Sequence, residues 1–186
     1  VNQYCFAFNC DISEQDQVQN TIDKVRQQNG TIDILVNCAG IAEGDVLEKI
    51  SLAQWSRVLN INLTGAFLVT QTCYPDMKVK QWGRIINITS QMAFSGGMGS
   101  SAYCASKAGL VGFTRSLAVE AAPFGVLVNS IAPGATETQM LDNCSDEFMA
   151  NKLKQIPLGR FGRPEEIAPT AVLLASEDGS FFVGQT

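Results

Sequence analysis

The stretch Ser100-Ser101-Ala102-Tyr103-Cys104-Ala105-Ser106-Lys107 opens a segment in which apolar residues recur at helical spacing as far as Ala118. That spacing predicts one buried helix. Tyr103 and Lys107 stand four positions apart, so a helix places the phenol and the ammonium on the same face. A nearby cation favours the tyrosinate and lowers the pKa of the phenol toward neutral pH, where it exchanges protons more easily. The alternative is a tyrosine packed in a core beside a lysine that reaches water.

The composition of the 186 residues predicts one globular domain over residues 1–186, because 46% are hydrophobic and 17% are charged. No apolar run is long enough to cross a bilayer, and the first residues carry no signal-peptide pattern. A formal net charge of -5 disfavours nucleic acid, which binds basic surfaces. We therefore expect neither nucleic acid nor a membrane among the partners.

The inventory of reactive side chains excludes several kinds of site. Histidine is absent, which removes Ser-His-Asp and Cys-His arrangements. The six cysteines form no C-x-x-C pair, so the usual zinc spacings are missing and no metal site is expected. They are scattered through apolar segments as free thiols usually are, which indicates a reducing, cytoplasmic setting. Acid–base chemistry must come from Tyr, Lys, Asp, Glu or Cys.

Strand and helix patterns alternate along the chain. Apolar runs predict strands at 4–9, 32–38, 83–88 and 126–131, with a last one beginning at 181–183. The run 32–38 is apolar almost throughout, which predicts burial on both faces. Helices are predicted from a cap at Asp11 or Ser13 to Gly30, over 52–77 behind a Ser51–Gln54 capping box, from Tyr103 to Gly125, and over 164–175. This alternation predicts an α/β fold with a doubly wound parallel sheet.

In such sheets ligands bind outside the carboxyl ends of the strands. Four unusual segments are predicted there: Asp11-Ile12, 37–40, Thr89-Ser90 and Pro133-Gly134. Each alone is an ordinary loop. Together they are expected to line one edge of the sheet, where the Tyr103 helix begins. The mixed, polar stretch 137–163 is expected to form a mobile cap of short helices.

Five motifs resemble those of the short-chain dehydrogenase/reductase family, in the same order and spacing. They are N-C-A-G (37–40), N-I-N-L-T-G (60–65), I-N-I-T-S (86–90), Y-C-A-S-K (103–107) and P-G-A-T-E-T (133–138). Cys38 departs from the family pattern, which is N-N-A-G. The stretches 83–134 and 157–166 are most similar to the 3-oxoacyl-[acyl-carrier-protein] reductase branch, although sugar and alcohol dehydrogenases share much of this pattern.

The resemblance implies a single NAD(P)-binding, Rossmann-like domain that is incomplete at both ends. The family's N-terminal strand–helix–strand unit with its Gly-rich turn is missing from this sequence, and so is the final strand. Glycines in that turn let the backbone approach the pyrophosphate, and the second strand ends in the residue that separates NAD from NADP. The implied cofactor is therefore NADP or NAD, with NADP slightly favoured.

The resemblance implies hydride transfer between nicotinamide and a carbonyl or alcohol carbon, and it gives four residues catalytic roles. Tyr103 exchanges the proton with the substrate oxygen, and Lys107 lowers the pKa of Tyr103 and bonds the nicotinamide ribose. Ser90 orients the substrate oxygen, and Asn62 holds a water that passes protons to Lys107. Taken singly, Ser90 is also typical of a strand-end cap, and Asn62 of a core amide bonded to its own helix.

A second implied set of residues binds the cofactor. Asp11 and Ile12 are expected to bracket the adenine ring, and they can cap the following helix as well. Thr136 and Thr138 are expected at the nicotinamide carboxamide, or in a plain polar loop. The full set is Asp11, Ile12, Asn37, Ala39, Gly40, Tyr103, Lys107, Pro133, Gly134, Thr136 and Thr138.

Three functional hypotheses remain open. The first is an NAD(P)-dependent oxidoreductase that reduces a small-molecule or carrier-bound 3-oxoacyl thioester, or else a sugar, polyol or other secondary-alcohol dehydrogenase. Arg160 and Arg163 would attract an acidic carrier or phosphate, or would simply face solvent. The second is a non-catalytic dinucleotide-binding protein with a structural or regulatory purpose, and the third is a stable but inactive core. The family pattern also implies a homotetramer formed through the helices that begin near Leu52 and Tyr103.

Overall fold

The computed structural model describes residues 5–142 and 144–186. In this part of the chain three parallel strands form a sheet in the order β1-β2-β3. They are β1 (Ile34–Asn37), β2 (Gly83–Ile88) and β3 (Val126–Ile131). Parallel neighbours need long crossovers, and helices supply them. The carboxyl ends of the three strands therefore meet at one edge.

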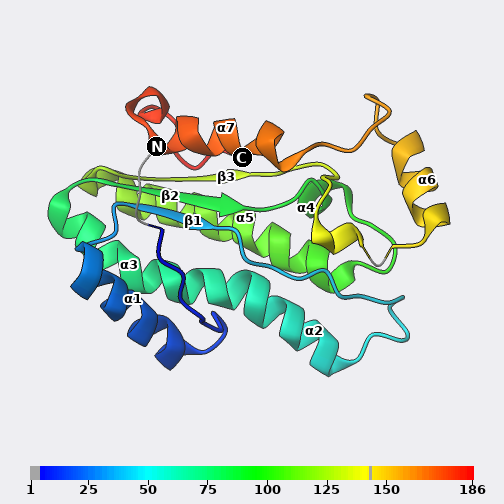
Figure 1. Cartoon of the computed structure of the whole chain (residues 1–186), viewed down its shortest axis with the longest axis horizontal. Coiled ribbons are helices and arrows are strands. Elements are labelled where there is room, and N and C mark those ends of the chain that lie inside the picture. Colours follow the sequence, from blue (N-terminus) through cyan, green and yellow to red (C-terminus); the bar gives the residue numbers. More distant parts are fainter. Residues whose placement is uncertain (1–4, 143) are drawn as a thin grey trace.

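Helices cover both faces of the sheet (Figure 1). On one face lies α7 (Pro164–Ala175), and on the other lie α3 (Ala66–Lys80) and α5 (Ser101–Ala121), with α1 (Gln15–Asn29) packed on α3. The predicted doubly wound α/β fold is confirmed, and the helix predicted over 164–175 has the expected bounds. The main core lies between the sheet and the helices α1, α3 and α5. It includes Val18, Ile22, Cys73, Met77, Ile85, Leu117, Val126 and Val128.

The helix predicted around Tyr103 is α5. Its buried stripe includes Lys107, Leu110, Thr114 and Leu117, which recur at the spacing of one helix face. The α-helix ends at Ala121 rather than at the predicted Gly125. A 3₁₀ turn, η2 (Ala122–Phe124), follows it, and Gly125 with φ of 68° ends that turn.

The helix predicted over 52–77 forms as one run to Lys80, but its middle is not α-helical. It consists of α2 (Leu52–Leu59), a π-helical turn η1 (Asn60–Gly65) and α3. The predicted capping box is confirmed, since the Gln54 backbone N–H donates to Ser51 Oγ over 3.2 Å and the Ser51 N–H donates to Gln54 Oε1 over 3.0 Å. Turns of the π type inside α-helices are frequent at functional sites, and this one contains Asn62.

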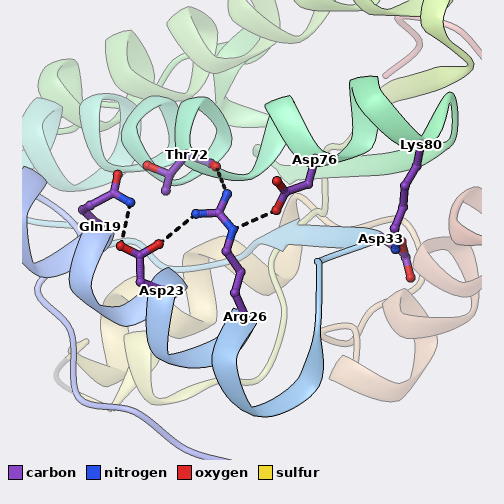
Figure 2. A network of polar contacts seen from close by, with 7 residues as sticks. All are labelled: Gln19, Asp23, Arg26, Asp33, Thr72, Asp76 and Lys80. Carbon is purple, nitrogen blue, oxygen red and sulfur yellow. Dashed lines mark hydrogen bonds and ion pairs between the residues drawn. The ribbon is translucent and has the colours of Figure 1, made fainter.

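A polar network fastens α1 to α3 (Figure 2). Arg26 on α1 donates from Nε to Asp76 Oδ2 over 2.8 Å and from Nη2 to the Thr72 carbonyl over 2.7 Å. Its Nη1 also donates to Asp23 Oδ1 over 2.9 Å within α1. A separate pair, Lys80 with Asp33, joins the end of α3 to the segment before β1 over 2.6 Å.

Two predicted strands are wrong. Tyr4 lies outside the described residues, but residues 5–9 form no strand, and neither do Phe181–Val183. A strand needs a hydrogen-bonded neighbour, which apolar patterning alone does not supply. Near the second of these segments the chain bonds irregularly to β3: the Gly184 N–H donates to the Val128 carbonyl over 2.9 Å, and the Ser130 N–H donates to the Gln185 carbonyl over 2.8 Å.

Two local predictions also differ from the structure. The N-cap of α1 is Glu14, which makes no side-chain cap bond. The Asp11 carboxylate instead accepts from the backbone and hydroxyl of Ser13, over 3.0 and 2.7 Å, and closes a local turn. Strand β1 is not buried on both faces, because Ile34 and Val36 each keep 44% of their surface exposed. Among the described strands β1 pairs only with β2, so it is an edge strand.

The stretch 137–163 contains η3 (Gln139–Leu141) and α6 (Asp146–Lys154), as the predicted cap of short helices requires. Ser145 caps α6 by accepting from the Phe148 N–H over 3.2 Å. Two further short helices are α4 (Met92–Ser95), between β2 and α5, and η4 (Glu177–Gly179), after α7.

Candidate active site

Three of the four predicted loop segments meet at the carboxyl edge of the sheet. Residues 37–40, 89–90 and 133–134 follow β1, β2 and β3 directly. The Thr89 N–H donates to the Ile131 carbonyl over 2.8 Å and the Gln91 N–H to the Pro133 carbonyl over 3.0 Å, which joins the second segment to the third. Asp11-Ile12 does not follow a described strand. Ile12 packs instead on Gly65 of η1, where an added Cβ would lie 2.7 Å from Ile12 Cγ1.

Lys107 is buried at this edge, with 4% of its surface exposed. Its Nζ donates to the carbonyl oxygen of Ile88, the last residue of β2, over 2.8 Å. The same Nζ lies 5.9 Å from the centroid of the Tyr103 ring, so the predicted pairing of amine and phenol is confirmed. Burial lowers the pKa of Lys107 to about 8, and the charge of the nearby Cys38 opposes that shift.

The pKa of Tyr103 moves opposite to the prediction. Burial raises this pKa, the hydrogen bond with Ser90 lowers it, and the charge of Cys104 raises it. The predicted lowering by Lys107 is therefore not what the structure gives. Two physical reasons account for this: desolvation disfavours the phenolate, and the ammonium is directed at the Ile88 carbonyl.

Ser90 is buried directly beyond the end of β2, with 8% of its surface exposed. Its hydroxyl accepts from the Met92 N–H over 3.1 Å, which caps the turn after the strand. The side chain is also near enough to the Tyr103 phenol to lower the pKa of that phenol.

Asn62 in η1 is 1% exposed and does not bond its own helix. Its Oδ1 accepts from the Ile41 N–H over 2.8 Å, and its Nδ2 donates to the Ile41 carbonyl over 2.9 Å and to Ser106 Oγ over 3.0 Å. The side chain therefore ties the loop after β1 to α5. Both amide hydrogens are used, so any water that Asn62 holds must bond another of its atoms.

Gly40 lies against the catalytic candidates. A Cβ at this position would come within 3.1 Å of Asn62 Oδ1 and 3.4 Å of Lys107 Nζ. The neighbouring Ala39 is exposed. A glycine therefore lets the loop backbone lie close to a buried cation, where a side chain would be crowded.

Asn37 belongs to the sheet rather than to an open pocket. Its Nδ2 donates to Thr70 Oγ1 over 3.0 Å and to Asn87 Oδ1 over 2.8 Å. Asn87 in turn donates to Thr114 Oγ1 over 2.8 Å. The predicted cofactor contact of Asn37 would have to come from other atoms of this residue.

A cleft of about 570 Å³ opens beside the loops after β2 and β3. Gly134 and Thr136 line it, whereas Thr138 is exposed and is not part of its wall. Pro133 is outside the wall too, and its carbonyl is bonded to the Gln91 N–H. The remaining wall comes from the α4 region, α6, the loop between α6 and α7, and the start of α7, and includes Gln91, Ser95, Lys152, Ile156, Pro157, Leu158, Arg160, Glu166 and Ile167.

Arg160 is already paired at the rim of this cleft. Its two terminal nitrogens donate to the Glu166 carboxylate over 2.8 and 2.7 Å, and Glu166 also accepts from the Arg163 N–H over 2.9 Å. These bonds lower the pKa of Glu166 to about 2. The positive charge expected from Arg160 and Arg163 is thus partly compensated.

Asp11 lines a second, polar cleft of about 390 Å³. Ser13 and residues of α2 and η1 form the rest of its wall: Ala53, Ser56, Arg57, Asn60 and Ile61. Hydrogen bonds from Ser13 hold the pKa of Asp11 below its ordinary value. The structure therefore separates the two predicted groups of cofactor residues, with Asp11 in one cleft and Gly134 and Thr136 in another.

Comparison with known proteins decides which family carries this arrangement. A family model described as enoyl-(acyl carrier protein) reductase matches residues 2–186. The chain belongs to the short-chain dehydrogenase/reductase family. Proteins named 3-oxoacyl-[acyl-carrier-protein] reductase FabG are similar to it: that of Aquifex aeolicus is 44% identical over 92% of this chain and 69% of its own length, and that of Thermotoga maritima is 40% identical over 94% and 71%. The Staphylococcus aureus protein of the same name is 39% identical over 97% and 74%.

As a short-chain dehydrogenase/reductase, the chain is an oxidoreductase that works with NAD(P)(H). The residues at the carboxyl edge fit that cofactor, because the Lys107 ammonium has three donors and gives one of them to the Ile88 carbonyl. Within residues 5–142 and 144–186, no cluster of three or more His, Cys, Asp or Glu is arranged to hold a metal ion. None of the helices described is long and apolar enough to cross a membrane.

Sequence reasoning missed several members of this site. The Ile88 carbonyl belongs to the backbone, which every residue has, so the sequence could not indicate its bond to Lys107. Ser106 and Thr114 had a signal, since both are small polar residues on the otherwise apolar face of α5. Such residues on a buried face are normally hydrogen-bonded to something.

Proposed function

We propose that this protein reduces a 3-oxoacyl thioester with NADPH. The observation that carries the proposal is the group of Ser90, Tyr103 and Lys107 at the carboxyl edge, where the Tyr103 ring lies beside a buried ammonium and Ser90 lowers the pKa of the phenol. The names of the similar FabG proteins favour the same substrate class.

The bound cofactor supplies the hydride from its nicotinamide ring. The protein's residues then stabilise and neutralise the negative charge that develops on the substrate oxygen. Ser90 and Tyr103 both donate to the carbonyl oxygen, which becomes more basic as the carbonyl carbon is reduced. Tyr103 transfers its proton to that oxygen, and the Lys107 ammonium stabilises the phenolate that remains. With a pKa lowered to about 8, Lys107 also returns a proton readily near neutral pH.

The cleft of about 570 Å³ is the proposed place of the acyl chain. Ile156, Leu158 and Ile167 give it an apolar wall next to Gln91, close after Ser90. Lys152 also lines the cleft, and among the described residues it has no acidic partner at ion-pair distance. We assign the attraction of an acidic carrier to Lys152 rather than to the compensated Arg160.

The remaining assignments extend this proposal. Asp11, which lines the polar cleft beside α2, flanks the adenine end together with its neighbour Ile12. Thr136 meets the carboxamide end, and Thr138 and Pro133 only shape the backbone there. NADPH is preferred over NADH, and the protein works in the cytoplasm.

The test is turnover of an acetoacetyl thioester with NADPH by the full chain and by a Tyr103→Phe variant. We expect the variant to lose about a thousandfold in kcat while its cofactor Kd is unchanged. Tyr74→Phe is the matched control, because the buried Tyr74 hydroxyl has no hydrogen-bond partner among the described residues. Equal activity of the two variants would remove Tyr103 from the mechanism.

Alternative substrates separate the other hypotheses in the same assay. A crotonyl thioester tests enoyl reduction, and a cyclic alcohol or sugar with NAD(P)⁺ tests the polyol branch. Faster turnover of either would replace the 3-oxoacyl proposal. Cofactor binding without turnover of any of them would favour the non-catalytic protein.

We also propose a homotetramer formed through α3 and α5. Phe67 on α3 keeps 41% of its surface exposed and stacks edge-on against Phe113 of α5, with ring centroids 6.1 Å apart. Val119, farther along α5, is 77% exposed. Sedimentation equilibrium is expected to give four times the chain mass, and Phe67→Asp to lower it. A purely monomeric wild type would contradict this assignment.

A further inference from the structure

Four hydrogen-bonded side chains, buried except for the half-buried Asn37, connect α3, β1, β2 and α5 next to the candidate active site. The series runs from Thr70 on α3 to Asn37 on β1, Asn87 on β2 and Thr114 on α5, through bonds of 3.0, 2.8 and 2.8 Å. Thr114 ends it by donating to the Leu110 carbonyl over 2.8 Å. Asn87 and Thr114 are both 0% exposed. Buried amides and hydroxyls at such distances hold their neighbours in a single arrangement.

The four hydrogen-bonded side chains reach the candidate active site at the end of β2. Asn37 and Asn87 are directly paired in the sheet, so their side chains join the last residue of β1 to the last but one of β2. The residue after Asn87 is Ile88, whose carbonyl accepts from Lys107 Nζ over 2.8 Å. Ser90, the partner of Tyr103, follows two residues later.

On α5, the residue that ends this hydrogen-bonded series lies on the same helix face as Lys107. Lys107 and Thr114 are seven residues apart, which places both on the buried stripe of the helix. Two consecutive residues of β2 are therefore held by one helix: Asn87 through the Thr114 hydroxyl, and Ile88 through the Lys107 ammonium. The bond from Asn87 to Thr114 sets how closely the end of β2 lies against α5.

We propose that Asn87 and Thr114 are positioning residues for the reaction: their hydrogen bond fixes the Ile88 carbonyl and Ser90 relative to Lys107 and Tyr103. Neither residue touches the reacting atoms. This inference rests on the proposed function for its kinetic consequence, whereas its geometric consequence for Lys107 does not. Loss of the bond leaves a buried amide without an acceptor, and the end of β2 must then shift toward another one.

The experiment removes only the hydroxyl, with Thr114→Val in the full chain. We expect kcat for acetoacetyl thioester reduction to fall about tenfold, with cofactor Kd unchanged. The titration midpoint of Lys107, followed by NMR of its ¹³Cε resonance and assigned with Lys107→Met, should move upward, because the looser contact admits water to the ammonium. Thr114→Ser keeps the hydroxyl and should keep both properties.

Thr72→Val is the matched control. Thr72 likewise donates its hydroxyl to the carbonyl four residues earlier, Leu68, over 2.9 Å, but it has no partner on a strand. If Thr114→Val unfolds, the double variant Asn87→Leu/Thr114→Val removes the orphaned amide together with its acceptor, and should show the same changes.

Three outcomes would overturn the inference. One is a lower melting temperature for Thr114→Val with kcat and the Lys107 titration both unchanged, which would indicate a purely structural role. The second is an equal change in Thr72→Val. The third is a failure of Thr114→Ser to restore wild-type behaviour. An inactive wild type would instead contradict the proposed function, and the Lys107 titration would still test the positioning.

Discussion

The ammonium of Lys107 lies 2.8 Å from the carbonyl oxygen of Ile88, and this bond anchors the lysine to the end of the central strand β2. The lysine is otherwise buried, and its pKa falls to about 8. A Y-x-x-x-K motif suggests an amine that serves the phenol directly. In this protein the amine donates a hydrogen bond to the backbone at the end of the strand. The centroid of the Tyr103 ring lies 5.9 Å from the same nitrogen.

The buried lysine makes stability depend on pH. In the unfolded chain the pKa of the lysine is about 10.4, whereas in the folded chain it is about 8. Between these values the unfolded state binds more protons, so the free energy of unfolding rises with pH, by about 3 kcal/mol in all. Lys107→Met should remove this rise, as measured by urea unfolding at pH 7, 8, 9 and 10.

Subtracting the two unfolding curves isolates Lys107. The pKa of Cys73 is raised to about 11 by burial, which lowers stability over part of the same range in both proteins and cancels in the difference. Parallel curves for wild type and Lys107→Met would show that the lysine titrates normally in the folded state.

Ser90 is predicted to act on both the substrate and the phenol. Its hydrogen bond lowers the pKa of Tyr103 against the effect of burial, so Ser90→Ala should raise that pKa further. The variant also loses one of the two donors to the substrate oxygen. We expect kcat/KM at pH 7 to fall about a hundredfold, and the basic limb of the pH profile to move to higher pH.

Ser95→Ala is the control for this variant, because Ser95 lines the neighbouring cleft and, among the described residues, its hydroxyl bonds the Gly96 carbonyl alone. A comparable loss of activity in Ser95→Ala would point to damage in the cleft wall rather than to a role of Ser90.

The elements that the sequence predicted well carry local signals. The helix over 164–175 begins at a proline, which is favoured in the first turn, and the capping box at Ser51 has its two members three residues apart. The π turn inside the helix from Leu52 to Lys80 has no such signal. It depends on Asn62 bonding Ile41 and Ser106, which lie far away along the chain.

The errors in the predicted strands share one cause, since strand formation depends on neighbours. The runs 5–9 and 181–183 are as apolar as β2, but no described strand pairs with them. The same dependence explains β1, whose apolar sequence predicted burial on both faces although Ile34 and Val36 remain partly exposed at an edge. For the site, spacing predicted that Tyr103 and Lys107 lie side by side. It did not predict the direction of the phenol pKa, which depends on desolvation in three dimensions.

Gly40 is predicted to be irreplaceable for steric reasons. A Cβ would lie 3.1 Å from Asn62 Oδ1 and 3.4 Å from Lys107 Nζ, and both side chains are held by other bonds. Gly40→Ala should cost about 1–3 kcal/mol of stability and lower kcat/KM more than its melting temperature would suggest.

Gly112→Ala provides the comparison for that variant. Gly112 lies inside α5 with nothing within 4 Å of an added Cβ, so alanine should raise stability by up to about 1 kcal/mol. Thermal unfolding and turnover of the two variants decide the matter. Undiminished activity in Gly40→Ala would mean that the loop after β1 is free to move away from Lys107.

Arg26 is predicted to contribute to folding and not to catalysis. It joins α1 to α3 through charge-assisted bonds to Asp76 and to the Thr72 carbonyl, at a side chain that is 26% exposed (Figure 2). Arg26→Gln should lower the free energy of unfolding by about 1.5–3 kcal/mol, because it removes partly buried bonds to charged groups.

Arg57→Gln is the control and should cost less than about 1 kcal/mol, since Arg57 is 60% exposed and its pair with Glu43 is on the surface. Urea unfolding measures both. Equal losses would show that the pairing of α1 with α3 rests on apolar contacts such as those of Val18 and Ile22, while a fall in kcat for Arg26→Gln would link α1 to the active site.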